Sequence, residues 1–187
     1  MKQHILPALK LTFISIVVFV GIYTIAIWAI AQAAPNHGRG ETVSINNKVV
    51  GYTLEGQNFT ADNYFNSRPS AAGYNAAGSS SSNKGPSNPD YLKQVQDRVD
   101  TFLVHNPGIK KEAIPAELVT ASGSGLDPDL SAKGAMIQVA RISKARNVPE
   151  EKLTTLVAQQ THKPLLGLFG TEKVNILQLN IELDKLK

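Results

Sequence analysis

The chain begins with a long apolar run, and apolar and polar residues alternate in shorter patterns after it. Residues Leu11 to Ala31 carry no charged side chain. A helix rises about 1.5 Å per residue, so this run would be about 32 Å long and would match a bilayer core of about 30 Å. The pattern predicts a transmembrane helix over residues 11–33, preceded by a short segment 1–10 and followed by a polar tether 34–41.

The charges on the N-terminal side of this run indicate which way it crosses the membrane. Lys2 and Lys10 lie there, and basic residues favour the cytoplasmic side. We therefore expect residues 1–10 to be cytoplasmic and residues 42–187 to form an extracytoplasmic domain. The alternative is a cleaved signal peptide, because Ala31-Gln32-Ala33 resembles a small-residue cleavage site. The apolar run exceeds the about 7–15 residues of a signal core, which favours an uncleaved anchor.

Beyond the tether the pattern predicts a β-hairpin and then a long loop. The runs Thr42–Ile45 and Lys48–Leu54 are rich in strand-forming residues, and Asn46-Asn47 between them tolerates the positive φ of a tight turn. From Asp62 to Asp90 the chain has little apolar periodicity and many Ser, Gly, Asn and Pro residues. Loops longer than about 12–15 residues are uncommon in compact domains and are usually functional or disordered.

The first half of this loop carries the residues that we predict as contacts to a partner. They are Tyr64, Phe65, Arg68 and Tyr74. Ordering a loop costs about 1–2 kcal/mol per fixed residue, so a loop is ordered mainly where it meets something. Aromatic side chains indicate that this half is held down, whereas Ser79 to Ser82 is predicted to be a solvated spacer.

Helical periodicity begins at Asn88-Pro89, where Asn can cap free amides and Pro suits the first helical position. This helix is expected to end near Asn106-Pro107-Gly108. We expect further helices over 131–147, 150–162 and 179–186, and short strands over 117–120 and 173–177. The predicted fold class is α+β: a single N-terminal transmembrane helix followed by one extracytoplasmic domain with a β-hairpin, short strands and three to four helices.

Composition and charge exclude a nucleic-acid-binding function and a disulfide scaffold. The chain has 19 Lys and Arg residues against 15 Asp and Glu residues. Basic residues are scattered among acidic neighbours, as at Lys110-Lys111-Glu112, so no single-sign stripe could follow a phosphate backbone. We therefore expect no nucleic-acid partner. Cysteine is absent, so an exported domain has no disulfide framework and depends on its core alone.

The sequence contains only weak matches to catalytic motifs. Asn83-Lys84-Gly85-Pro86 has the reverse of the order found in phosphate-binding loops. In Ala121-Ser122-Gly123-Ser124-Gly125, Ser122 stands where the nucleophile elbow requires glycine. His105 and His162 are the available bases. We expect no catalytic site and no cofactor belonging to this chain, and an exported serine hydrolase stays open as an alternative.

Asp127 and Asp129 form the densest acidic site in the domain. Two carboxylates can bind a hard cation, but calcium takes about six to eight oxygen ligands, and the neighbouring side chains are mostly apolar. Polar side chains before a helix more often accept hydrogen bonds from its free amides. We therefore predict capping or structural roles for Asp127, Asp129 and Ser131, as for Asn88 and Pro89, and no metal site.

Five sequence blocks, taken in order, resemble a known family. Together with the basic N-terminus and the single span, they resemble the C subunit of the Kdp potassium-transporting P-type ATPase. The blocks are YFNSRPSAAGYN (64–75), GPSNPDYLKQVQDRV (85–99), VTASGSGLDPDLS (119–131), QVARISKAR (138–146) and LLGLFGTEKVNILQLNIELD (165–184).

The resemblance implies an accessory, non-catalytic subunit of a high-affinity potassium uptake complex in a bacterial inner membrane. Its partners would be a potassium-channel-like subunit, a P-type ATPase subunit, a small helical subunit and membrane lipid. The family is described as a catalytic chaperone that raises the ATP affinity of the pump subunit, so its link to ATP passes through that subunit. Because the charges place the domain outside, any nucleotide effect would be transmitted through the membrane assembly. A signal-cleaved periplasmic binding module is the other open alternative.

Overall fold

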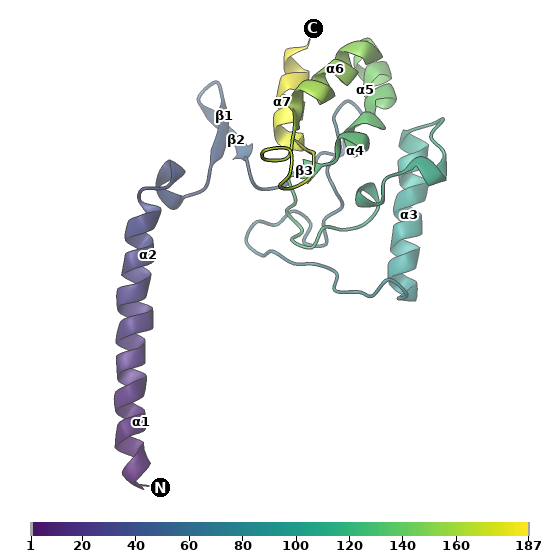
Figure 1. Ribbon diagram of the computed structural model, residues 1–187. Helices are drawn as coiled ribbons and strands as arrows, with labels where there is room; N and C mark the ends of the chain where they lie inside the picture. Colours follow the sequence, from purple (N-terminus) through teal and green to yellow (C-terminus); the bar gives the residue numbers. More distant parts are fainter. Residues whose placement is uncertain (1, 187) are drawn as a thin grey trace. The chain divides into compact units, whose positions relative to one another are not determined.

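The computed structural model describes residues 2–186 and divides the chain into two compact units, with the boundary between Thr42 and Val43. The first unit is one continuous helix made of α1 (Lys2–Ser15), the π-helical segment η1 (Ile16–Ile22) and α2 (Tyr23–Ala31) (Figure 1). Within the helix Gln3–Ala31 an 18-residue window has a mean hydropathy of 2.5, and the helix is long and apolar enough to cross a membrane. The predicted N-terminal apolar helix is confirmed.

The π-helical segment gives this helix one wide turn. Tyr23 N donates to the Val18 carbonyl, a spacing of five residues instead of the four of an α-helix. None of the side chains of η1 or α2 is buried. After the helix, a 3-10 turn, η2 (Pro35–Gly38), lies in the segment that the sequence predicts as a tether.

The predicted hairpin starts at the boundary of the second unit and consists of β1 (Thr42–Ile45) and β2 (Lys48–Tyr52). Asn46 and Asn47 have φ values of 50° and 61°, as the tight turn requires. No helix or strand follows until α3 (Pro89–His105), so the long loop is present as expected. At the start of α3, Asn88 Oδ1 accepts a hydrogen bond from Tyr91 N at 3.1 Å, and Pro89 occupies the first turn.

The core lies where three helices pack on a small antiparallel sheet and a fourth, α5 (Val139–Arg146), packs on α6 (Glu150–Gln160) (Figure 1). The three helices on the sheet are α6, α4 (Ala132–Met136) and α7 (Ile176–Lys185). The strands run in the order β3 (Asp129–Leu130), β5 (Lys173–Asn175) and β4 (Thr161–His162). Their most buried apolar side chains include Leu130, Ile142, Leu153, Val174, Leu179 and Leu183. The predicted α+β class is confirmed.

Three predicted elements differ from the structure. The strand expected over 173–177 ends at Asn175, because Asn175 caps the helix that begins at Ile176. The strand expected over 117–120 is wrong, because residues of this range form a 3-10 turn, η4 (Ala116–Leu118). A second 3-10 turn, η3 (Lys111–Ala113), precedes it. The Thr120 amide and hydroxyl both donate to the Ala116 carbonyl, at 2.9 and 2.7 Å, which closes the turn.

The helix expected over 131–147 is two helices, α4 and α5, because Gln138 interrupts it. Its backbone amide donates to the Ala135 carbonyl at 3.1 Å. Its side-chain Nε2 donates to the Gly134 carbonyl at 3.0 Å, taking the acceptor that the amide would use in a continuous α-helix.

Replacing Gly56 by alanine should destabilise the domain. Gly56 N donates to the Leu126 carbonyl at 2.7 Å, and a Cβ here would overlap the Asp127 carbonyl oxygen, which is backbone and cannot rotate away. We expect a loss of about 1–3 kcal/mol in the free energy of unfolding, measured by urea denaturation of the full chain in detergent. Gly78→Ala is the matched control, because nothing lies within 4 Å of its added Cβ. Equal stability of the two variants would contradict the close approach.

Candidate functional site

The loop residues that the sequence singles out lie in two groups on the second unit. Tyr64 and Phe65 contact α7, whereas Arg68 and Tyr74 lie together beside Asp127. The structure therefore does not bring all four to one spot. It ties the loop to the rest of the domain at both places.

Phe65 is a core residue and not a surface for a partner. Its side chain has no exposed area and belongs to the main apolar cluster. Its backbone is paired with a single side chain: Phe65 N donates to Asn180 Oδ1, and Asn180 Nδ2 donates to the Phe65 carbonyl, both at 2.9 Å. The prediction that Phe65 contacts a partner is therefore wrong. Its ring holds the loop against the core of this same domain.

Tyr64 lies at the edge of the same region and is partly exposed. Its hydroxyl donates to Asp184 Oδ2 at 3.1 Å, and the Arg146 guanidinium lies 4.6 Å above its ring centre. Arg146 also forms an ion pair with Asp184 at 2.7 Å and donates to the Asn63 carbonyl at 2.6 Å. The three side chains connect the loop to α5 and α7, and Tyr64 also packs against the Phe59 ring, with the centroids 5.8 Å apart.

Arg68 and Tyr74 form the second group. Arg68 Nη1 pairs with Asp127 Oδ2 at 2.9 Å, and the Tyr74 hydroxyl donates to the Arg68 carbonyl at 2.5 Å. The buried Nε of Arg68 has no hydrogen-bond partner among the described residues. Burial raises the pKa of the Tyr74 phenol above its usual range, although the positive charge of Arg98 works in the opposite direction. Tyr74 is therefore neutral at physiological pH and serves as a donor.

A buried arginine that the sequence analysis missed holds the start of the loop. The Arg141 side chain is only 4% exposed, and all its N–H groups have acceptors. Burial lowers the pKa of its guanidinium, and the Asp62 charge opposes that shift. The acceptors are Asn106 Oδ1 (3.1 Å), the Asp62 and Ala61 carbonyls (2.5 and 3.4 Å), Asn66 Oδ1 (2.5 Å) and Gln138 Oε1 (2.8 Å).

The acidic pair has structural partners. Asp127 binds Arg68, and its Oδ1 accepts from the Asp129 amide at 3.1 Å. Asp129 lies in β3 and pairs with Lys173 at 2.7 Å. The cap of α4 is Ser131, whose Oγ accepts from the Gly134 amide at 3.0 Å. Neither aspartate caps that helix, because both lie before Ser131 and point to basic side chains.

The serine-hydrolase alternative lacks the contact between nucleophile and base. Ser122 Oγ is buried and accepts from the Gly125 amide at 2.9 Å, and Ser124 Oγ accepts from the Leu126 amide at 3.0 Å. Over residues 2–186 neither hydroxyl bonds a histidine, and His105 Nδ1 lies 2.8 Å from Asp62 Oδ1. In that same part of the chain no group of three or more acidic, histidine or cysteine side chains converges on a metal position.

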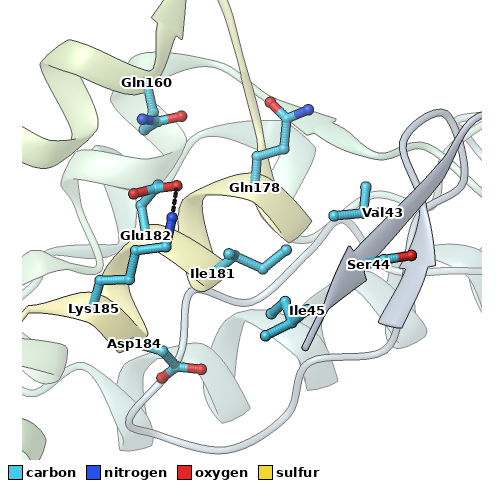
Figure 2. Close-up of a pocket in the computed structure, with 9 residues that line it drawn as sticks. All are labelled: Val43, Ser44, Ile45, Gln160, Gln178, Ile181, Glu182, Asp184 and Lys185. Atoms are coloured by element: carbon cyan, nitrogen blue, oxygen red, sulfur yellow. Dashed lines mark hydrogen bonds and ion pairs between the residues drawn. The ribbon is translucent and has the colours of Figure 1, made fainter. Parts of the chain in front are cut away.

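A groove of about 540 Å³ lies between β1 and α7. Figure 2 shows Ile181 of α7 on the side that faces Val43 and Ile45, while Glu182 and Lys185 pair with each other at 2.6 Å. Of the charged groups that line the groove, Glu182 and Lys185 thus pair within α7, and Asp184 pairs with Arg146 of α5. None of the four predicted contact residues lines the groove.

The fold and the side-chain contacts thus define a protein with one N-terminal helix that is long and apolar enough to cross a membrane, joined to an α+β domain. The family described as "K+-transporting ATPase, c chain" (KdpC) matches residues 5–185, and the chain belongs to it.

Relatives support the same family over nearly the full length. Proteins named Potassium-transporting ATPase KdpC subunit share 56% identity in Flavobacterium psychrophilum and 52% in Flavobacterium johnsoniae, each over 185 residues. Those alignments cover 99% of this chain and 100% of each relative. The relative of the same name in Bacteroides fragilis strain YCH46 is 49% identical over 188 residues, covering 99% of this chain and 98% of the relative.

Proposed function

We propose that the chain is the membrane-anchored accessory subunit of a potassium-transporting ATPase. The observation that carries this proposal is the extent of the match: the similarity includes the apolar helix as well as the domain, since it covers 99% of the chain. The anchor and the domain therefore belong together as one unit of function. Its partners are the potassium-channel-like subunit, the P-type ATPase subunit and the small helical subunit of the complex.

The proposed arrangement places the domain outside the cytoplasm of a bacterial inner membrane. Lys2 and Lys10 precede the most apolar part of the helix, which supports a cytoplasmic N-terminus. ATP would then be bound by the pump subunit alone, with no cofactor held by this chain. An effect of this chain on ATP affinity, as a catalytic chaperone, would pass through the assembled membrane segments.

Co-purification tests the subunit proposal. The tagged full chain, extracted in mild detergent, should bring down a multi-span protein and a P-type ATPase, identified by mass spectrometry. A variant that lacks residues 1–33 behind an exported signal should lose most of this association, because the helix can no longer pack in the membrane. Recovery of the full chain alone, as a monodisperse protein, would contradict the proposal and support a binding module.

Protease accessibility tests the orientation. Protease added to spheroplasts should degrade the region after Pro35, and sealed inside-out vesicles should protect it. The reason is that the flanking lysines favour the cytoplasmic side. A cytoplasmic protein serves as the leakage control. Protection in spheroplasts would reverse the orientation and allow direct contact between the domain and cytoplasmic ATP.

Substitutions in the loop test whether its exposed residues contact a partner. Arg68→Ala or Tyr64→Ala should lower complex recovery or potassium-stimulated ATPase activity several-fold while the domain stays folded, because both residues are partly exposed. Replacing Ser79 to Ser82 with a Gly/Ser mixture should leave both unchanged. Thermal melting of each variant is measured in parallel. Activity losses that follow melting temperature alone would assign these residues to loop folding.

A further inference from the structure

A cavity of about 320 Å³ lies between α3, η4 and the first part of the long loop. Pockets that bind small molecules range from about 300 to about 1,000 Å³. Arg98, Phe102 and His105 follow one another in α3 at spacings of four and three residues, so they lie on one face of the helix and line the cavity together. Leu118 of η4 and Asp62 of the loop line its other walls. The cavity is thus bordered by three segments that are separate in the sequence.

Arg98 brings an unpaired positive charge to this cavity. It is partly buried, and in the part of the chain that the structure describes its one hydrogen bond runs from Nη1 to the Val119 carbonyl at 3.2 Å, with no carboxylate partner. The three other arginines of the second unit each pair with an aspartate. A guanidinium offers five N–H donors in a planar fork that fits a carboxylate. Most of the donors of Arg98 are therefore available to a ligand.

The other charges on the wall indicate how much negative charge the ligand carries. Asp62 already has two basic neighbours, His105 Nδ1 at 2.8 Å and Arg141 Nη1 at 3.8 Å from its Oδ1. Among the described residues that line the cavity, the positive charge of Arg98 is the one left without a partner. One negative charge on the ligand would balance it. A second would lie near the Asp62 carboxylate without compensation, which is costly in a partly buried site.

The remaining walls indicate that the ligand also has an apolar part. Leu118 is only 8% exposed, and Phe102 packs against the main apolar cluster of the domain. An aromatic ring and a leucine side chain favour an apolar surface over a hydrated ion, because contact with an apolar body removes both from water. Inorganic ions therefore fit this cavity less well than an organic acid.

We propose that this cavity binds a small organic acid that has one carboxylate and an apolar body. Arg98 pairs with the carboxylate, and the body lies against Phe102 and Leu118. Because its walls come from α3, η4 and the loop, the bound acid joins these three segments and stabilises the domain. The inference goes beyond the proposed function, since it assigns to this chain a ligand of its own.

Equilibrium dialysis of the full chain, with the same detergent on both sides, tests the binding. The probes are radiolabelled benzoate and hexanoate, two monocarboxylates with different apolar bodies, and benzamide, which has the shape of benzoate without its charge. At least one of the acids should bind one site per chain with a Kd of about 1 mM or tighter. Benzamide should bind at least about tenfold more weakly than benzoate, because it cannot form charge-assisted hydrogen bonds.

Substitutions on α3 locate the site. Arg98→Gln should weaken binding about tenfold or more, and Arg98→Lys should weaken it less, because lysine keeps the charge but not the planar fork. Lys93→Gln is the matched control, because it removes the same charge from an exposed position of α3 outside the cavity. Thermal melting of each variant checks that the domain stays folded.

Several results would overturn the inference. One is equal binding of benzoate and benzamide by the unaltered chain, a comparison that does not depend on the folding of any variant. Others are equal binding by the Arg98→Gln and Lys93→Gln variants, and no saturable binding of either acid up to about 20 mM. Displacement of benzoate by inorganic phosphate or ATP at lower concentrations than by unlabelled benzoate would also overturn the assignment to a monocarboxylate. The dialysis uses this chain alone, so its result is independent of the co-purification that tests the proposed function.

Discussion

Replacing Arg141 by alanine is expected to cause one of the largest stability losses in the domain, about 3–5 kcal/mol. The guanidinium supplies hydrogen bonds to three side chains and two carbonyls that lie in or beside the core. Removing it leaves Asn66, Asn106 and Gln138 with buried polar atoms that water cannot reach easily. Urea denaturation of the full chain in detergent, followed by the near-ultraviolet circular dichroism of its tyrosines, measures the loss.

Two further variants separate this network from a simple charge effect. Lys144→Ala, on the exposed side of the same helix α5, should change stability by no more than about 0.5 kcal/mol. Arg141→Lys should be intermediate, because an ammonium keeps the charge but cannot reproduce the planar set of donors. Protease should also cut near residues 59–66 in Arg141→Ala. A loss below about 1 kcal/mol, with no new cleavage, would contradict the role of Arg141 in holding the loop.

Asn180→Ala is expected to cost about 2–5 kcal/mol. Asn180 is 2% exposed and bonds both the amide and the carbonyl of Phe65, so it acts as a short strand partner for the loop. Alanine would leave both backbone groups of a buried residue unpaired. It would also leave a small void in the core beside Phe65. The same urea denaturation measures the loss.

The control for this prediction lies on the same helix. Gln178→Ala removes a partly exposed side chain of α7 and should change stability by no more than about 0.5 kcal/mol. Asn180→Asp should also destabilise, because it exchanges the donor to the Phe65 carbonyl for a buried acceptor. Equal stability of Asn180→Ala and Gln178→Ala would show that the loop is held by its side chains and not by its backbone.

Local signals in the sequence predicted most elements correctly. The hairpin turn at Asn46-Asn47 and the start of α3 at Asn88 depend on residues that are adjacent in the chain, and both are confirmed. The break between α4 and α5 was missed, because Gln138 is a good helix former and its interruption depends on a side-chain hydrogen bond to Gly134. The short-range sequence pattern does not indicate whether this side-chain hydrogen bond forms.

The partners of the loop could not be predicted for a related reason. Phe65 meets Asn180 across 115 residues, and Asn66 meets Arg141 across 75. An aromatic residue in a polar stretch indicates an anchoring point, but it does not tell whether the anchor is the chain itself or another protein. Arg141 was missed because a basic residue in an amphipathic helix is usually exposed, and only the fold shows its burial.

The wide turn at Ile16–Ile22 changes what the anchor presents to its surroundings. Successive residues of an α-helix are rotated by about 100°, and one extra residue in a turn shifts every later side chain by that angle. A neighbouring helix could pack along side chains spaced three and four residues apart in α1. Beyond η1 it would no longer contact the same line of side chains. A line of side chains along α1 therefore does not continue in line along α2. The two halves of the helix can contact different neighbours within the thickness of one bilayer.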